Sequence, residues 1–210
     1  RKVGWEADTW NLRYSKGTRP AKGHCVAIAE WPTNSSVSEH GFVDYALFID
    51  TKLVATIEAK AKHTDIPSVI DYQCKDYSRH IREEDAPFVI SQWGQNQVPF
   101  TFATNGRPYL KQLETKSGIW FLDLRMPNNK PKPLKGWISP TGILELLERD
   151  IEAGNRALEE MPYDLLRDRD GLNLRAYQIK AIQAAEAAVI RGQENILLAM
   201  ATGTGKTRTI

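Results

Sequence analysis

Cysteine and long apolar runs are both scarce in this chain of 210 residues. The two cysteines, Cys25 and Cys74, are too few and too scattered for a disulfide framework or a zinc site. A buried, reduced thiol is expected at each of them, as in proteins of the cytosol. No apolar run approaches the length of a membrane span, and no signal peptide is recognisable. The sequence therefore predicts a cytoplasmic protein without a membrane partner.

An excess of one charge sign is also lacking, because the formal net charge is only +2. This figure permits a nucleic-acid partner without arguing for one, since a local basic groove can be hidden within it. Hydrophobic residues make up 41% and charged residues 26%, which indicates a folded chain. The length suits one ordinary domain and part of another. The chain begins at Arg1 and ends within a motif, so we expect a piece of a longer polypeptide.

Two apolar runs, residues 41–50 and 53–60, flank the polar break Asp50-Thr51-Lys52 and predict a β-hairpin. If Thr51 centres a three-residue turn, residue 44 lies opposite residue 58. A two-residue turn would instead place residues 44 and 58 on opposite faces. The length of the turn therefore decides which side chains meet.

With the three-residue turn, Asp44, Glu58 and Lys60 converge on one face of the hairpin. Carboxylates that face each other repel unless a cation lies between them, and oxygen ligands suit Mg²⁺ or Mn²⁺. A lysine beside such an ion can steady the charge that develops on a phosphate during hydrolysis. The pattern predicts a phosphodiester-cleaving site with Asp44 and Glu58 as metal ligands. Solvated acids at strand ends are the alternative.

A helix is predicted over residues 66–82 from the spacing of its apolar residues, with Pro67 in its first turn. Gln73 and Tyr77 lie four residues apart on it and share a face, which could reach DNA or the metal site. A structural tyrosine beside a solvated glutamine is the alternative. Further strands are predicted at 24–31, 88–91, 100–104 and 119–125, and a surface loop at 127–136.

A new unit is predicted to open near Ser139-Pro140, an N-cap followed by the first helical position. A polar helix should run from there to about residue 160. A charged linker then follows at 164–171, an Ala-rich helix at 174–191, and an apolar strand at 196–200.

That strand leads into a Gly-rich turn with the pattern of a phosphate-binding loop. Gly203 and Gly205 would let backbone N–H groups close around phosphate oxygens, Lys206 would reach the β- and γ-phosphates, and Thr207 would ligate Mg²⁺. Met200 replaces the first glycine of the common pattern.

The helix before this loop carries a candidate for adenine recognition. Gln178 can pair with the N6/N7 edge of adenine, and Arg175 stands three residues before it. A polar helix start is the alternative. Together with the loop, these two residues predict an ATP site.

These motifs resemble a known family when they are taken in order. Residues 41–45, 57–60 and Gln73-x-x-x-Tyr77 resemble the nuclease motifs of the RecB-like branch of the PD-(D/E)xK fold. Residues 174–178 and 200–207 resemble the Q-motif and motif I of superfamily 2 helicases. A nuclease placed before such a motor is similar to the restriction subunit of type I restriction-modification enzymes, and the resemblance covers about residues 41–210.

The resemblance implies an ATP-driven translocase that cleaves double-stranded DNA in complex with methyltransferase and specificity subunits. It implies that Asp44 and Glu58 bind Mg²⁺, that Lys60 is catalytic, and that Gln73 and Tyr77 are accessory residues. ATP would serve the full-length protein only.

The sequence departs from the family pattern in several places. Val43 stands before Asp44 in place of proline, and the acidic motif II and the later motor motifs are absent. Some relatives use an upstream acid, for which Glu6 and Glu30 are open candidates.

The expected fold is α/β. A restriction-endonuclease-like mixed sheet flanked by helices would occupy 1–138, a helical connector 139–172, and the first strand and loop of a RecA-like motor 173–210. Two other functions remain open. One is a helicase-nuclease of DNA repair or recombination, and the other is a DNA-binding module with a decayed nuclease site.

Overall fold

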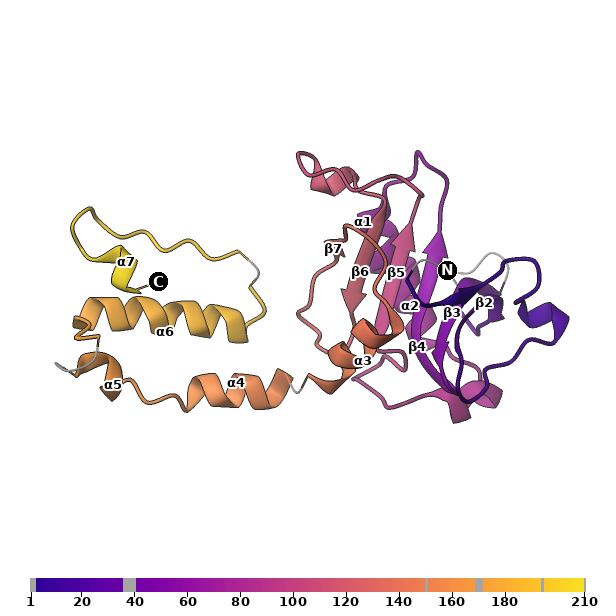
Figure 1. The fold of residues 1–210 in the computed structure, drawn as a ribbon, viewed down its shortest axis with the longest axis horizontal. Helices are drawn as coiled ribbons and strands as arrows, with labels where there is room; N and C mark the ends of the chain where they lie inside the picture. The colour runs from indigo at the N-terminus through magenta and orange to yellow at the C-terminus, as the bar shows by residue number, and fades with distance from the viewer. Residues whose placement is uncertain (1–2, 36–40, 150, 169–171, 194, 210) are drawn as a thin grey trace. The chain divides into compact units, whose positions relative to one another are not determined.

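The computed structural model describes residues 3–35, 41–149, 151–168, 172–193 and 195–209. It forms two compact units, Arg1–Glu148 and Arg149–Ile210 (Figure 1). The sequence placed a domain boundary at residue 138, ten residues before the point at which the compact units divide. Each unit is described by itself below.

The first unit is built on a seven-stranded mixed sheet whose strands lie in chain order. Its strands are β1 (Glu6–Ala7), β2 (Cys25–Pro32), β3 (Phe42–Ile49), β4 (Lys52–Ala59), β5 (Phe100–Thr104), β6 (Ile119–Asp123) and β7 (Lys132–Pro133). The pairs β1–β2 and β4–β5 are parallel and the other neighbours are antiparallel. The predicted α/β class and the strands near 24–31, 100–104 and 119–125 are confirmed, whereas the predicted loop 127–136 contains β7.

The turn of the β3–β4 hairpin differs from the predicted one. Ile49 pairs with Lys52, so Asp50 and Thr51 form a two-residue turn rather than a three-residue turn centred on Thr51. Asp50 has φ 54°, in the left-handed region that aspartate tolerates better than most residues. Its side chain also accepts a hydrogen bond from the N–H of Gly23 at 2.6 Å, which anchors the turn.

A β-bulge restores the register that the turn alone would have lost. The pairing shifts between Leu47 and Phe48, which leaves Val54 as an extra residue on β4. Beyond the bulge, Tyr45 pairs with Ile57, as the three-residue turn would have required. Because a one-residue shift changes the face of every following side chain, this bulge decides which residues meet at the far end of the hairpin.

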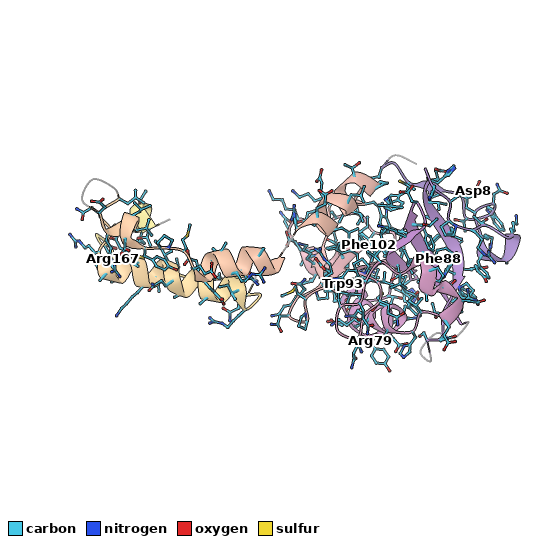
Figure 2. The ribbon with its side chains drawn as sticks, turned by 90° about the horizontal axis from the view of Figure 1, so that it is seen from below. Asp8, Arg79, Phe88, Trp93, Phe102 and Arg167 are labelled. Carbon is cyan, nitrogen blue, oxygen red and sulfur yellow. The ribbon has the colours of Figure 1, made fainter. Side chains whose placement is uncertain are left out.

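A helical crossover covers one face of the sheet between the parallel strands β4 and β5 (Figure 1). It consists of α1 (Ile66–Val69), a π-helical turn η2 (Ile70–Cys74) and α2 (Lys75–Arg79), so the predicted helix 66–82 is confirmed over most of its length. Tyr77 packs in the core cluster of β2, β3 and β4, beside which Phe88 lies (Figure 2).

The predicted strand 88–91 is wrong. A 3₁₀-helix, η3 (Glu83–Phe88), ends where that strand should begin, and only an isolated bridge joins Val89 to Leu53. The reason is that β4 already has β3 and β5 as hydrogen-bonded neighbours, which leaves no free edge for a further strand. Two other 3₁₀-helices are η1 (Tyr14–Lys16) and η4 (Glu114–Lys116).

The other face of the sheet is covered by α3 (Pro140–Glu148) and by the N-terminal segment. Ser139 caps α3 as predicted, because its Oγ accepts a hydrogen bond from the N–H of Gly142 at 3.1 Å. Ile143 is completely buried in the same core cluster as Trp5 and Phe102. Helices therefore flank the sheet on both faces.

The second unit contains α4 (Ile151–Glu159), α5 (Asp164–Arg167), α6 (Ala176–Ile190) and α7 (Lys206–Thr209). The helix predicted from 139 to 160 is divided into α3 and α4, and residue 150 lies outside the described residues. The predicted linker 164–171 contains α5, while residues 169–171 also lie outside the description. The predicted helix 174–191 is confirmed as α6.

The strand predicted at 196–200 is wrong, because these residues form no strand. Leu197 is 91% exposed, and Ile196 is exposed as well. A strand of a parallel sheet needs neighbours to pair with, and no strand occurs among the described residues of this unit. Among the helices that the structure describes, none is long and apolar enough to cross a membrane.

Candidate active site

Asp44 on β3 and Glu58 on β4 meet at the open end of the hairpin. Tyr45 pairs with Ile57, so extending this register by one residue sets Asp44 opposite Glu58. Asp44 Oδ2 accepts a hydrogen bond from the N–H of Ala59 at 2.6 Å, which fixes the aspartate against the neighbouring strand. The two acids predicted to face each other are therefore brought together.

Lys60 completes the group. Its Nζ lies 2.6 Å from Oε1 of Glu58, and its N–H donates to the carbonyl of Thr104 at 2.7 Å, which extends the β4–β5 ladder by one residue. The Lys60 side chain is partly exposed, whereas Glu58 is only 5% exposed. The second carboxylate oxygen of Glu58, Oε2, is buried and has no hydrogen-bond partner among the described residues. A buried acceptor in that state is costly, which marks the site as one suited to a ligand.

Burial raises the pKa of Glu58, and the nearby charge of Asp44 raises it further. The ammonium of Lys60 and the hydroxyl of Tyr77 favour the charged form and lower the pKa of Glu58, although burial outweighs them. An added positive charge beside Glu58 would oppose the effect of burial and favour the ionised form.

Gln73 and Tyr77 form a linked pair on the crossover helix, as the sequence predicted. Gln73 Nε2 donates to the hydroxyl oxygen of Tyr77 at 2.6 Å, and this bond does not use the tyrosine proton. Tyr77 is buried and acts on the pKa of Glu58, which lies on the face that the helix covers. Cys74, one turn away, is also buried, and burial raises the pKa of its thiol, which keeps it neutral.

The donor set fits a divalent cation in one specific respect. Asp44 and Glu58 supply carboxylate oxygens, and Oε2 of Glu58 is an acceptor that has no donor in the described part of the chain. The described residues hold no group of three or more His, Cys, Asp or Glu side chains placed to bind a metal ion. Two protein carboxylates are a usual complement for Mg²⁺, which keeps several waters and binds substrate phosphate.

The two open candidates for a further acid are placed differently. Glu6 on β1 pairs with His24, whose Nδ1 lies 2.9 Å from its carboxylate. Glu30 lies on β2 between residues that pair with Tyr45 and Val43, so it stands opposite Asp44 in the sheet. Its carboxylate forms an ion pair with Arg13, and its φ is 54°. Of the two, Glu30 is the acid that the sheet places beside Asp44.

In the second unit, the lysine of the predicted phosphate loop forms hydrogen bonds with carbonyl groups of the same loop. Lys206 Nζ donates to the carbonyl oxygens of Met200 at 3.2 Å and Ala201 at 3.1 Å. Gly203 and Gly205 have φ values of 80° and 75°, which the turn requires. The lysine begins α7, so the loop runs directly into a helix, although no strand precedes it among the described residues of this unit.

The residue proposed to read adenine is engaged with the same loop. Gln178 is 4% exposed, and its Nε2 donates to the carbonyls of Gly205 at 3.0 Å and Thr204 at 3.3 Å. Its Oε1 accepts from the N–H of Arg175 at 2.9 Å, which caps α6. Thr207 follows in α7. The structure thus brings Gln178, which caps α6 beside Arg175, against the predicted phosphate loop.

Sequence reasoning missed the backbone groups that hold the first site. The N–H of Ala59 and the carbonyl of Thr104 fix Asp44 and Lys60, and every residue type except proline supplies both kinds of group. The bulge at Val54, which decides the register, likewise has no distinctive residue that marks it in the sequence.

Comparisons with known proteins give a consistent result. A family model described as the second domain of the type I restriction enzyme EcoKI endonuclease subunit matches residues 6–147. A second, described as the res subunit of type III restriction enzymes, matches residues 171–210. No solved structure matches.

Two curated relatives from Escherichia coli are similar to the chain. The type I restriction enzyme EcoKI endonuclease subunit of strain K12 is 39% identical over an alignment that covers 100% of this chain and 19% of the relative. The EcoAI endonuclease subunit is 31% identical over 74% of this chain and 16% of its own length. The chain thus spans less than a fifth of the length of these curated relatives.

Proposed function

The chain belongs to the family of type I restriction enzyme endonuclease subunits, and from that premise we propose that its first unit hydrolyses phosphodiester bonds of double-stranded DNA. The observation that carries the proposal is the meeting of Asp44, Glu58 and Lys60 at one end of the β3–β4 hairpin. One oxygen of Glu58 has no hydrogen-bond partner among the residues that the structure describes. Family membership alone would not select these side chains.

In this proposal, Asp44 and Glu58 hold Mg²⁺ or Mn²⁺. When bound, the ion supplies a Lewis acid that polarises the phosphate and lowers the pKa of a coordinated water. Asp44 is kept in position by the N–H of Ala59, and Lys60 and Tyr77 favour the ionised form of Glu58. The reaction adds the hydroxide of water to phosphorus and breaks one P–O ester bond, with a proton passing to the leaving oxygen.

Lys60 would supply the cation that this reaction requires. Its ammonium lies 2.6 Å from Glu58 while its side chain is partly exposed, so it can reach an incoming phosphate without leaving the carboxylate. A preformed positive charge at the place where negative charge develops lowers the barrier, because no reorganisation is needed during the reaction. Gln73 and Tyr77 act behind Glu58 as positioning residues.

The wider assignment follows the family. The longer protein would use ATP, bound by Lys206, Thr207 and Gln178, to move along DNA before cleavage. Methyltransferase and specificity subunits would be its partners in the complex. The support for the motor part is the res-subunit match at residues 171–210 and the closed loop around Lys206.

The test uses the full-length subunit assembled with its partners. Asp44→Asn, Glu58→Gln and Lys60→Ala should each lower DNA cleavage by about 10²-fold or more, as expected when a group that stabilises developing charge is removed. ATP hydrolysis should continue, because its site lies in the other unit. Glu83→Gln, an exposed acid of the first unit, is the matched control. Normal cleavage by any of the three variants removes that residue from the site.

A further inference from the structure

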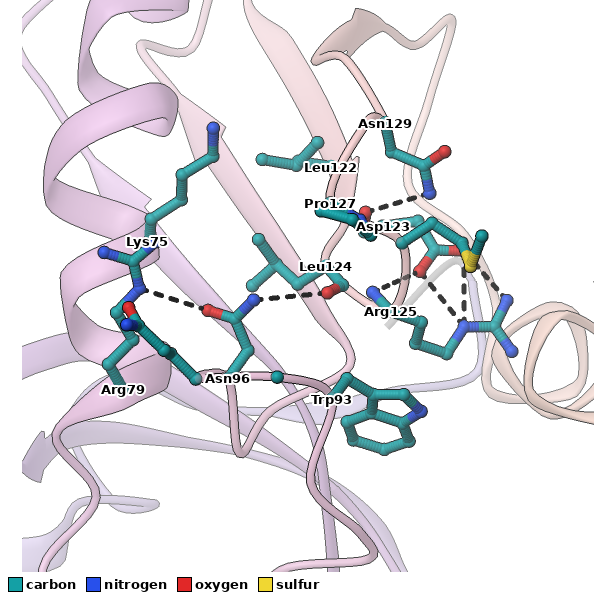
Figure 3. Close-up of a pocket in the computed structure, with 13 residues that line it drawn as sticks. Lys75, Arg79, Trp93, Asn96, Leu122, Asp123, Leu124, Arg125, Pro127 and Asn129 are labelled. Atoms are coloured by element: carbon teal, nitrogen blue, oxygen red, sulfur yellow. Dashed lines mark hydrogen bonds and ion pairs between the residues drawn. The ribbon is translucent and has the colours of Figure 1, made fainter. Parts of the chain in front are cut away.

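The first unit has a cavity between α2, the 93–96 turn and the end of β6 (Figure 3). The cavity has a volume of about 280 Å³. Ala103 pairs with Glu58, whereas Asp123, which lines the cavity, pairs with Phe100 three residues earlier on β5. At about 3.3 Å per residue, that separation is roughly 10 Å along the strand. The cavity therefore cannot hold the phosphate that is cut.

Its lining is cationic. Lys75 and Arg79 line one side from α2, and Arg125 lines the other, against a single carboxylate, that of Asp123. Arg125 is neutralised by Asp123, to which it donates through Nε at 3.0 Å and through its NH2 group at 2.8 Å. Lys75 pairs with Asp71, whose side chain is 56% exposed, and exposed pairs of this kind contribute little.

Arg79 is the cation that remains available. Within the part of the chain that the structure describes, its one hydrogen bond runs from Nε to Oδ1 of Asn96 at 3.4 Å, and it forms no ion pair. The two NH2 groups of its guanidinium thus have no partner among the described residues, and the side chain is exposed at the rim of the cavity (Figures 2 and 3). A guanidinium with its fork unused matches the paired oxygens of a phosphate.

Trp93 supplies an aromatic surface on the same cavity. Trp5, Trp31 and Trp120 each donate their indole N–H to an acceptor. Among the described residues, Trp93 has neither an acceptor for its N–H nor a ring or cation partner. It is half-buried, so part of its indole remains accessible to a ligand.

The turn that carries Trp93 is held in place beforehand. Trp93 and Asn96 exchange backbone hydrogen bonds of 2.8 and 3.0 Å, and Asn96 Nδ2 donates to the carbonyl of Leu124 at 3.2 Å. Asn96 Oδ1 also accepts from Ser78 Oγ at 2.8 Å, which ties the turn to the crossover helix. A ligand would meet a formed surface, which lowers the ordering cost of binding.

We propose that this cavity binds one nucleotide of a single DNA strand, with a phosphate on Arg79 and Lys75 and the unpaired base against Trp93. A cavity of about 280 Å³ suits one nucleotide rather than a base pair. Stacking on an aromatic side chain beside a cationic groove is the usual mode of single-strand binding. The inference rests on the proposed function only in taking DNA as the ligand. It adds a binding site for a DNA strand outside the cleavage site.

The test is fluorescence anisotropy of a labelled oligothymidylate titrated with the 210-residue chain in EDTA, where no cleavage occurs. Trp93→Ala should weaken binding about fivefold or more, as stacking contacts do. Arg79→Ala should make the slope of log K against log salt less steep by about 0.7, the value for one phosphate contact on a single strand. Trp93→Phe keeps a ring and should retain most of the affinity, which separates lost stacking from misfolding.

The matched controls are Trp10→Ala and Arg167→Ala, both at exposed positions outside the cavity. Equal affinity of the Trp93 and Arg79 variants and these controls overturns the proposal. So does a duplex probe that binds as tightly as the single strand, or polyglutamate that competes as well as the oligonucleotide, because both indicate surface charge alone.

Failure of this proposal and failure of the nuclease assignment can be told apart. If Glu58→Gln leaves cleavage intact while the Trp93 and Arg79 variants weaken binding, the nuclease assignment fails and the nucleotide-binding cavity stands. If Glu58→Gln abolishes cleavage while the cavity variants bind as wild type does, the nuclease site stands and the proposed cavity site is overturned.

Discussion

The carboxylate site of the first unit and the phosphate loop of the second relate to their sequences in opposite ways. Asp44 and Glu58 are separated along the chain, and they meet because a hairpin with a bulge sets their register. Lys206 and the glycines before it are contiguous in sequence, yet the strand expected to present the loop has not formed. A contiguous motif is easy to recognise, but its function needs neighbours that the motif does not contain.

The two sites also differ in whether their polar side-chain atoms already have hydrogen-bond partners. In the first unit, Glu58 Oε2 is buried without a donor among the described residues, so a cation would complete the site. In the second, Lys206 Nζ and the amide of Gln178 are both engaged with backbone carbonyls of the loop. A ligand would satisfy an open acceptor at the first site, whereas at the second it must replace existing bonds. In this chain, the first site should therefore respond to a divalent cation, whereas the second site should not hydrolyse ATP.

The largest expected effect concerns Lys206. In the longer protein, Lys206→Ala should lower ATP hydrolysis by about 10²-fold or more, because the cation that meets the phosphates is removed. The 210-residue chain should show no ATP hydrolysis above a Lys206→Ala control, since it lacks an acidic motif II and an arginine finger worth ~10³–10⁵ in rate. Phosphate release measures both. ATP hydrolysis by the wild-type chain above that control would contradict the proposed difference between the two sites.

A smaller effect on DNA cleavage is expected from substitutions of Tyr77 and Gln73. Tyr77→Phe removes a hydroxyl that lowers the pKa of Glu58, so that pKa should rise and the acid limb of the pH–rate profile for DNA cleavage should move to higher pH. We expect a loss of about tenfold in rate near neutral pH. Gln73→Ala, which frees the tyrosine hydroxyl, should shift the profile in the same direction.

Tyr72→Phe is the matched control, because Tyr72 lies on the same helix and is 68% exposed. A lower rate in Tyr77→Phe with an unchanged pH profile would mean that Tyr77 has only a packing role.

The smallest effect is on stability without metal. The pKa of Glu58 is raised in the folded state, so its contribution to stability is present below the ordinary value of 4.5 and is lost as the pH rises through the folded value. Glu58→Gln removes the buried charge, and its melting temperature in EDTA at pH 7 should exceed that of wild type by about 2–4 °C. The difference should vanish near pH 4. The exposed Glu83→Gln should follow wild type at every pH.

The parts of the fold that sequence predicted best are those with local causes. The strands near 24–31 and 100–104 follow from apolar composition, and the cap of α3 follows from Ser139-Pro140. The strand expected at 88–91 failed because β4 already had two neighbours, a fact of the whole sheet. The strand at 196–200 failed for lack of any neighbour among the described residues of its unit. Apolar composition measures the tendency to pair and says nothing of whether an edge is free.

The sequence predicted which residues meet at the candidate site, but it did not predict the feature of the sheet that brings them together. The three-residue turn centred on Thr51 was wrong, and the expected facing of Asp44 and Glu58 survived because the bulge at Val54 added the missing residue. A bulge is set by packing on both faces of a sheet, which no local pattern records. The cavity beside Trp93 was likewise beyond sequence reasoning, since α2, β6 and the 93–96 turn are distant in the chain.

The metal site that we propose for Asp44 and Glu58 belongs to the first unit alone. All six tryptophans lie within residues 1–148, so thermal melting followed by tryptophan fluorescence reports that unit and not the second. Mn²⁺ binds the folded site and not the unfolded chain, so it should stabilise wild type by RT ln(1 + [L]/Kd), about 2.7 kcal/mol at 100 times Kd. Lys206→Ala and Glu83→Gln should keep this response.

Asp44→Asn is the decisive variant in this melting experiment, because it removes one charge while its side-chain oxygen can still accept the hydrogen bond from Ala59. We expect this variant to melt at or above wild type in EDTA, where the repulsion from Glu58 is relieved, and to lose most of the rise with Mn²⁺. A wild-type chain without any shift at millimolar Mn²⁺, or an Asp44→Asn variant with the full shift, would contradict the paired-carboxylate site.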